Sequence, residues 1–386
     1  GTASRSAPQI ADEVAGLGGS LTTASTMDAT QVSVRSLRRT FPALLEVMSD
    51  VVRRPSFPAA EIDRQRASRL ASLVQQRENP NAVAATVVAA ALYGPSHPYG
   101  YTELGTEASN RAMTRDDLEG FWRQNFVSNN TALVVSGQIA EAELRPMIEK
   151  AFGDWQPGKP ASPALGTPAT TAARLVLLDK PGSPQTQLRV ATIGAPRSAP
   201  AYEAIEVMNE ALGGLFSSRI NLNLRERHGY TYGASSQFVY RRTAGPFMVA
   251  TGVRTEVTAP AVTEILKEIR GVRDAPLSTD ELALAKDSIV RSLPAQFETS
   301  ARVTASTANI YAYDLGLDYY AKLPARLSAV TAEMAKAAAQ QYLVPDQLVV
   351  VAVGDRSKIA AELQKLKLGP IEARTAEGTL VASPRR

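Results

Sequence analysis

This chain of 386 residues contains an internal sequence repeat, and the repeat restricts its possible folds more than any other feature. Residues Asn129–Gly153 contain an apolar run, a glycine and an amphipathic pattern, and Pro345–Gly369 repeat that order, with Gly137 matching Gly354. Each copy predicts a buried strand, a glycine turn and a helix. The strands are set among paired helices without a regular βαβ alternation, which favours an α+β fold. We therefore expect two tandem homologous domains, each a mostly antiparallel sheet with helices packed on one face.

A second correspondence supports the duplication. The stretches TQVSVRSLRRTFPALLEVMSDVVRRPSFPAAEIDRQRASRLASL and PFMVATGVRTEVTAPAVTEILKEIRGVRDAPLSTDELALAKDSIVRSL both predict strand, helix, turn and helix. Within them, Phe57-Pro58 correspond to Leu277-Ser278. Helix starts are marked at Thr114–Asp117 and Ser278–Glu281, where an oxygen side chain precedes an acidic first turn.

The halves are joined by a stretch rich in proline, alanine and threonine. It has no apolar period, so it predicts an extended linker over residues 157–174, between domains 1–156 and 175–386. The first half lacks a strand-forming stretch that the second half has. In the second half this stretch, ARLVLLDKPGSPQTQLRVATIGAPRS, precedes the helix that is equivalent to the first helix of the chain. We expect a strand pair to be missing at the N-terminus or to be supplied by another chain.

Composition excludes several classes of function. The formal net charge is +4, but acidic and basic residues are interspersed, so we expect no nucleic-acid partner. No apolar run is long enough for a membrane span. The chain has no cysteine, which excludes disulfides and thiolate metal sites and suits the bacterial periplasm, with the cytoplasm as the alternative.

The common catalytic templates are absent as well. The sequence has no Gly-x-Ser-x-Gly elbow, no phosphate-binding loop and no dinucleotide fingerprint after a strand. Its two histidines, His97 and His228, lie in different halves, and we expect a loop role for the first and a helix-end role for the second. We therefore expect no metal or other cofactor on this chain.

Arg225 and Tyr232 stand seven residues apart around a glycine, where a predicted helix gives way to a predicted strand. On one interpretation they are an ordinary surface arginine and strand aromatic. On the other, both project into a cleft, where a phenol can donate to an oxyanion and a guanidinium can hold a peptide carbonyl or carboxylate. The following run YGASSQFVY alternates small and larger groups, and predicts a sheet surface to which an extended peptide adds as a strand.

The segment LGGLFSSRINLNLRERHGYTYGASS resembles the second-half signature of the pitrilysin/insulinase family of zinc metallopeptidases, which includes the mitochondrial processing peptidase. GTASRSAPQIADEVAGLGGSL, FPALLEVMSDVVRRPSFPAAEIDRQRASRL and ALYGPSHPYGY also resemble the family, so the resemblance covers nearly the whole chain in order. It implies that Arg225 and Tyr232 complete an active site by contacting substrate near the zinc. The residues assigned to substrate binding alongside them are Gly213, Gly214, Ser217 and Ser218, although LGGLFSS on its own is typical of a helix stop followed by a polar cap.

The departures from the family pattern concern the metal. The family's His-x-x-Glu-His motif would lie before Gly1, and the third ligand, a glutamate, falls at Ser72, with Gln65 one helix-face repeat earlier. A serine hydroxyl is a poor substitute for an anionic zinc ligand. The resemblance thus implies a subunit without zinc that supplies Arg225 and Tyr232 to a heterodimer whose homologous partner holds the zinc, with peptides as substrates. The alternatives are a purely structural family member, a self-sufficient peptidase whose zinc motif lies upstream of Gly1, and a peptide-binding module without activity.

Overall fold

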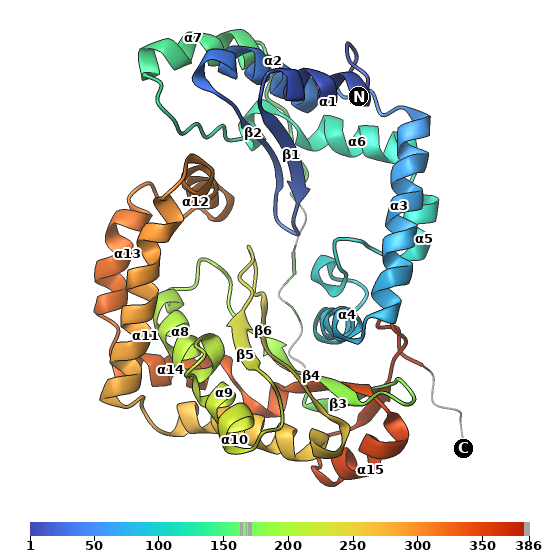
Figure 1. Cartoon of the computed structure of the whole chain (residues 1–386), viewed down its shortest axis with the longest axis vertical. Helices are drawn as coiled ribbons and strands as arrows, with labels where there is room; N and C mark the ends of the chain where they lie inside the picture. Colours follow the sequence, from blue (N-terminus) through green and yellow to red (C-terminus); the bar gives the residue numbers. More distant parts are fainter. Residues whose placement is uncertain (163–164, 167, 169–171, 382–386) are drawn as a thin grey trace. The chain divides into compact units, whose positions relative to one another are not determined.

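The computed structural model describes residues 1–162, 165–166, 168 and 172–381, and these form two compact units, neither of which is continuous in sequence (Figure 1). The first unit comprises Gly1–Ser72, Gly105–Ala164 and Pro294–Asp314, and the second comprises Leu73–Leu104, Leu165–Leu293 and Leu315–Arg386. The predicted boundaries at residues 156 and 175 stay a prediction. Part of the predicted linker, residues 163–164, 167 and 169–171, lies outside the described residues.

The first unit is built of helices around a single hairpin, as far as the described residues go. The hairpin pairs β1 (Ser20–Ser25) with β2 (Thr30–Arg35), and α1 and α2 lie against it (Figure 1). The α-helices of this unit are α1 (Ala7–Gly16), α2 (Phe41–Arg53), most of α3 (Ala59–Glu78), α5 (Glu107–Ala112), α6 (Arg115–Asn125), α7 (Glu141–Phe152) and α12 (Ser300–Tyr313).

The buried strand predicted within Asn129–Gly153 does not form, although its helix does, as α7. Residues 131–136 have no regular secondary structure and are half-buried to exposed. A strand needs a neighbour for its N–H and C=O groups, and among the described residues β1 and β2 pair only with each other. The apolar run joins neither strand of that hairpin, so its backbone groups have no strand partner.

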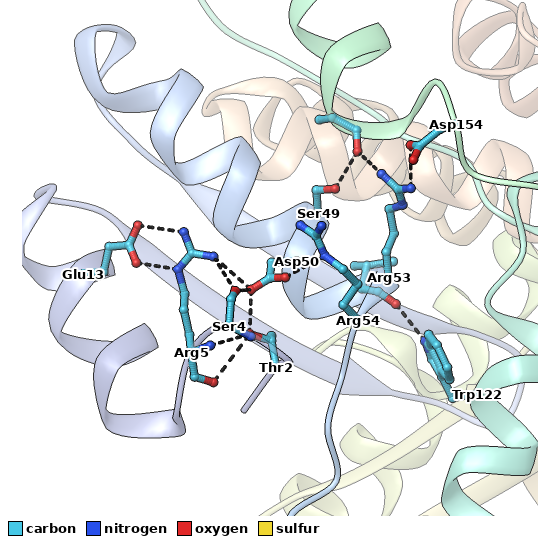
Figure 2. A network of polar contacts seen from close by, with 12 residues as sticks. Thr2, Ser4, Arg5, Glu13, Ser49, Asp50, Arg53, Arg54, Trp122 and Asp154 are labelled. Atoms are coloured by element: carbon cyan, nitrogen blue, oxygen red, sulfur yellow. Dashed lines mark hydrogen bonds and ion pairs between the residues drawn. The ribbon is translucent and has the colours of Figure 1, made fainter.

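Hydrogen bonds fix the N-terminal segment to the end of α2 (Figure 2). The fully buried carboxylate of Asp50 accepts from Thr2 Oγ1 at 2.5 Å, Ser4 Oγ at 2.7 Å, Arg5 Nη1 at 2.9 Å and Arg54 Nε at 2.8 Å. Burial alone would raise the pKa of Asp50, but the bonds from Thr2, Ser4 and Arg5 hold it below its usual range. Four donors therefore keep this carboxylate ionised.

The second unit contains a six-stranded sheet with the order β5-β6-β4-β7-β3-β8. The β4–β6, β4–β7 and β5–β6 pairs are antiparallel, whereas β3 runs parallel to β7 and to β8. The strands are β3 (Arg174–Asp179), β4 (Gln185–Ile193), β5 (Ala234–Phe238), β6 (Pro246–Arg254), β7 (Val349–Gly354) and β8 (Ile371–Ala373). The longer helices are α4 (Pro80–Tyr93), α8 (Tyr202–Asn209), α10 (Thr258–Asp274), α11 (Thr279–Ser292), α13 (Tyr319–Ser328), α14 (Ala332–Tyr342) and α15 (Arg356–Lys365).

Helices cover both faces of this sheet, whereas the sequence analysis placed them on one. Helix α4 lies on one face of the sheet and α10 on the other (Figure 1). Arg189 of β4 bonds Asn81 of α4, whereas Thr186 of β4, on the opposite face, bonds Thr258 of α10. The cause is the composition of β7: every residue of VVVAVG is buried, so neither face can be left to water. The α+β class and the mostly antiparallel pairing are confirmed. No helix of the described residues is long and apolar enough to cross a membrane.

Candidate functional site

The segment from α8 to β5 carries the predicted site residues and is wound irregularly. It contains two π-helical stretches, η4 (Glu210–Gly214) and η5 (Leu222–Arg227), on either side of the short helix α9 (Arg219–Asn221). Isolated π-helical turns are rare and occur most often at functional sites. The predicted change from helix to strand is confirmed, with η5 ending at Arg227 and β5 beginning at Ala234.

The adjacent glycines Gly213 and Gly214 lie in η4, where there is little room for a side chain. A Cβ atom on Gly213 would lie 2.5 Å from the backbone nitrogen of Ser236 in β5 and 2.7 Å from its Cβ, so only glycine fits there without a shift. On Gly214 it would lie 2.3 Å from Oε2 of Glu210. Asn209 completes the contact by donating from Nδ2 to the Ser236 carbonyl at 3.1 Å. These contacts give Gly213 a packing role.

The two serines have different environments. Ser217 is exposed, whereas Ser218 precedes α9 and is buried. The Ser218 hydroxyl has no hydrogen-bond partner among the described residues. Of the two, only Ser217 is accessible from solvent.

Arg225 lies in η5 and is held against an aromatic ring. Its guanidinium carbon is 4.4 Å from the centroid of the Phe216 ring, a cation–π geometry, and its Nε is 3.5 Å from the Glu226 carboxylate. Phe216 is nonetheless 67% exposed. The stacking brings Arg225 to the LFSS segment and leaves guanidinium donors available to a ligand.

Tyr232 lies in the turn between η5 and β5 and is 92% exposed. The backbone around it is fixed: the Thr231 hydroxyl donates to the Gly252 carbonyl at 2.8 Å and accepts from the Gly233 nitrogen at 3.1 Å. Within the described part of the chain, the phenol of Tyr232 has no hydrogen-bond partner. A fixed turn thus holds a large aromatic side chain in water, where burial of the ring does not stabilise the fold.

The turn itself is closed by backbone hydrogen bonds. Gly229, with φ of 60°, donates to the Arg225 carbonyl at 3.1 Å, and Tyr230 donates to the Leu224 carbonyl at 2.8 Å. A positive φ favours glycine, which explains the glycine between Arg225 and Tyr232.

Sequence reasoning missed a buried asparagine that fastens η5 to α10. The Asn223 side chain is 2% exposed, and its Nδ2 donates to Glu264 Oε2 at 2.9 Å and Glu268 Oε1 at 2.6 Å. The hydrogen bond from Asn223 is the main reason why the pKa of Glu264 is lowered. The only hint of this contact in the sequence is that Glu264 and Glu268 are spaced by four residues, and such spacing is common on exposed helices.

A second fastening links the start of α9 to α11. Arg219 donates from Nε and Nη2 to the two carboxylate oxygens of Glu281, at 2.6 and 2.7 Å. Glu281 also accepts from the backbone of Ser278, in the predicted capping box, which is confirmed together with that at Thr114. The bond from Arg219 lowers the pKa of Glu281 to about 2.

Strand β5 is an edge strand of the six-stranded sheet, and its residues alternate between buried and exposed. Part of its outer edge is already occupied. Asn221 Oδ1 accepts from the Ala234 nitrogen at 3.0 Å, and Asn209 donates to the Ser236 carbonyl. The prediction that a peptide adds along this run is wrong at these two residues, because side chains satisfy the backbone groups that it would need.

The described donor set does not fit a zinc ion. These residues contain no group of three or more His, Cys, Asp or Glu side chains placed to hold a metal. Ser72, at the expected glutamate position on α3, donates its hydroxyl to the Ser68 carbonyl at 3.0 Å. His97 lies in a loop, where its Nδ1 accepts from the Tyr99 nitrogen at 3.0 Å, and His228 follows the end of η5 and stacks on Tyr230.

Comparisons with known proteins identify the family. A model described as insulinase (peptidase family M16) matches residues 1–102, and one described as the peptidase M16 inactive domain matches residues 112–289. The chain belongs to the insulinase-like M16 family. The crystal structure of a peptidase M16 inactive domain from Pseudomonas fluorescens superposes on this M16 chain with a TM-score of 0.85 and 26% identity, over 92% of this chain and 85% of that one.

Curated relatives of this M16 chain carry peptidase names. An uncharacterized zinc protease from Mycobacterium tuberculosis is 24% identical over 301 residues, which are 78% of this chain and 68% of the relative. A probable mitochondrial-processing peptidase subunit beta from Schizosaccharomyces pombe is 25% identical over 220 residues, 55% of this chain and 47% of the relative. The structure of a Helicobacter pylori protease has a TM-score of 0.83 at 17% identity, over 92% of this chain and 86% of that one, which supports the fold alone.

Proposed function

We propose that this M16 chain is the zinc-free subunit of a heterodimeric peptidase and supplies Arg225 and Tyr232 to bind an extended peptide during its hydrolysis. In this proposal the homologous partner holds the metal. Ser72 supports it, because a hydroxyl at the position expected for the third ligand is a poor substitute for a carboxylate. The observation that carries the proposal is Tyr232, whose phenol is almost fully exposed on a turn fixed by Thr231 and has no other partner in the described chain.

The two residues have separate roles in this proposal. The Tyr232 hydroxyl donates a hydrogen bond to the oxyanion that forms when the scissile carbonyl becomes tetrahedral. The Arg225 guanidinium, supported from one side by the Phe216 ring, donates to a backbone carbonyl of the peptide and orients it. Tyr232 is almost fully exposed, and the half-buried Arg225 keeps guanidinium donors available, so both can meet a substrate held by another chain.

The test is a conservative substitution in the reconstituted pair. In a mixture with a zinc-motif homologue from the same source, Tyr232→Phe lowers the turnover of a quenched fluorescent peptide by about 10²–10³, because one oxyanion donor is lost. Tyr230→Phe is the matched control: that ring is half-buried against His228, so its hydroxyl deletion leaves turnover within about twofold.

Two other results of this experiment would favour a different function. Full activity of the Tyr232→Phe pair would contradict the proposal and favour the purely structural role suggested by the description of the matched model as an inactive domain. Tight peptide binding without turnover by any mixture would indicate a binding module.

A further inference from the structure

We infer that Asn223 is a positioning residue that holds Arg225 in place, through a clasp between η5 and α10. This role for Arg225 rests on the proposed function, whereas the clasp itself does not. Asn223 is almost completely buried, and it lies in the same π-helical stretch as Arg225, two residues before it.

The clasp consists of one amide group and two carboxylates. Asn223 Nδ2 directs its two hydrogens to Glu264 at 2.9 Å and Glu268 at 2.6 Å, which stand four residues apart on α10. Hydrogen bonds to charged acceptors in a buried setting are about twice as strong as neutral ones. Asn223 is the only group of η5 that bonds both carboxylates in the described structure, so its loss removes these hydrogen bonds to α10 while the buried Leu224 still packs in the core.

Backbone bonds carry the effect from Asn223 to Arg225. The His228 nitrogen donates to the Asn223 carbonyl at 3.2 Å, a π-type bond, and also to the Arg225 carbonyl, so one backbone donor links the two residues. A π-helical turn is less stable than an α-helical one and needs such outside support. Without the clasp, the turn relaxes and the stacking of Arg225 on Phe216 is lost.

The experiment has one arm on the chain alone and one on the reconstituted pair. In the first arm, trypsin cleavage after Arg225 and Arg227 is timed by mass spectrometry for wild type, Asn223→Ala and Asn223→Asp. We expect both variants to be cut at least ten times faster at these bonds, since cleavage follows local opening. Lys267→Ala is the matched control: Lys267 bonds the same Glu264 at 3.1 Å but is exposed and lies outside the clasp, so the rate stays within twofold of wild type.

In the second arm, Asn223→Ala lowers kcat of the pair at least tenfold, with a smaller change in KM. Asn223→Asp places a third carboxylate against the glutamates, so its activity rises at lower pH, where a shared proton relieves the repulsion. The double variant Asn223→Asp with Glu268→Gln restores a donor–acceptor pair and recovers activity. A merely structural residue would show neither the pH dependence nor the rescue.

Each failure is distinguishable. Unchanged trypsin cleavage in Asn223→Ala overturns the clasp, whatever the pair does. If trypsin cuts Asn223→Ala faster but kcat of the active pair is unchanged, the positioning role is overturned. If the wild-type pair is inactive but trypsin cuts Asn223→Ala faster, the clasp is supported and the proposed function is contradicted. Asn223 would then hold Arg225 in place without serving catalysis.

Discussion

At the scale of single residues, three buried or half-buried polar side chains hold irregular segments in place through charged neighbours. Asp50 accepts from four donors around the N-terminal segment (Figure 2). Asn223 bridges two glutamates near the candidate site, and Glu281 accepts two hydrogen bonds from one arginine. Removing one side chain of such a pair lowers the free energy of unfolding by more than the pair contributes, because the other side chain stays buried and unpaired. The irregular segments thus depend on a few polar contacts.

Glu281 gives a pH-dependent prediction at this scale. Its pKa is about 2 in the folded chain against an ordinary 4.5, so its ionised form stabilises the fold above pH 4.5, and this contribution is lost as the pH falls toward 2. Because a third of the side chain is exposed, we expect Glu281→Gln to lower the free energy of unfolding by on the order of 2 kcal/mol at pH 7.

Urea unfolding at pH 7, 5 and 3.5 measures this difference. It should be the same at pH 7 and 5 and smaller at pH 3.5. Equal stability of the two proteins at pH 7 would show that the bidentate contact with Arg219 contributes nothing in solution.

At the scale of elements, local sequence rules predicted what local interactions determine. The caps at Thr114 and Ser278, the helix after Gly137 and the helix-to-strand change around Gly229 are confirmed, because each depends on neighbours in sequence. The strand expected at residues 131–136 failed, because a strand depends on a partner that no local pattern reveals. Asn223 was missed for the same reason, since its acceptors lie 41 and 45 residues away.

The contact of η4 with β5 gives a prediction for Gly213. Gly213→Ala forces a methyl group against the Ser236 backbone, so we expect a loss of about 1–3 kcal/mol in the free energy of unfolding. Gly120→Ala in α6 is the control: its Cβ meets nothing within 4 Å, and we expect a gain of about 0.5–1 kcal/mol from helix propensity. Equal urea midpoints for the two variants would show that η4 does not pack on β5 as described.

At the scale of the whole molecule, the two compact units are unequal, and neither coincides with one half of the sequence. The six-stranded sheet of the second unit belongs to a large apolar core, whereas in the first unit Val14, Leu44 and Val47 form a small cluster against a two-stranded hairpin. A two-stranded sheet is only marginally stable by itself. We therefore expect the first unit to unfold at a lower denaturant concentration than the second.

The two tryptophans of the chain, Trp122 and Trp155, both lie in the first unit and report on it alone. In a urea titration, tryptophan fluorescence should change at a lower midpoint than the hydrogen-exchange protection of β4 and β7. Coincident transitions would contradict the difference in stability between the units.

The central claim is that this M16 chain needs a partner for the metal and supplies Arg225 and Tyr232 to the shared reaction. The most direct measurement is zinc content and cleavage of a quenched fluorescent peptide, on this chain alone, on a zinc-motif homologue alone and on their mixture. We predict zinc in the homologue and cleavage in the mixture alone. Stoichiometric zinc with full cleavage by this chain alone would contradict the account, and would show that Ser72 does not mark the lost ligand position.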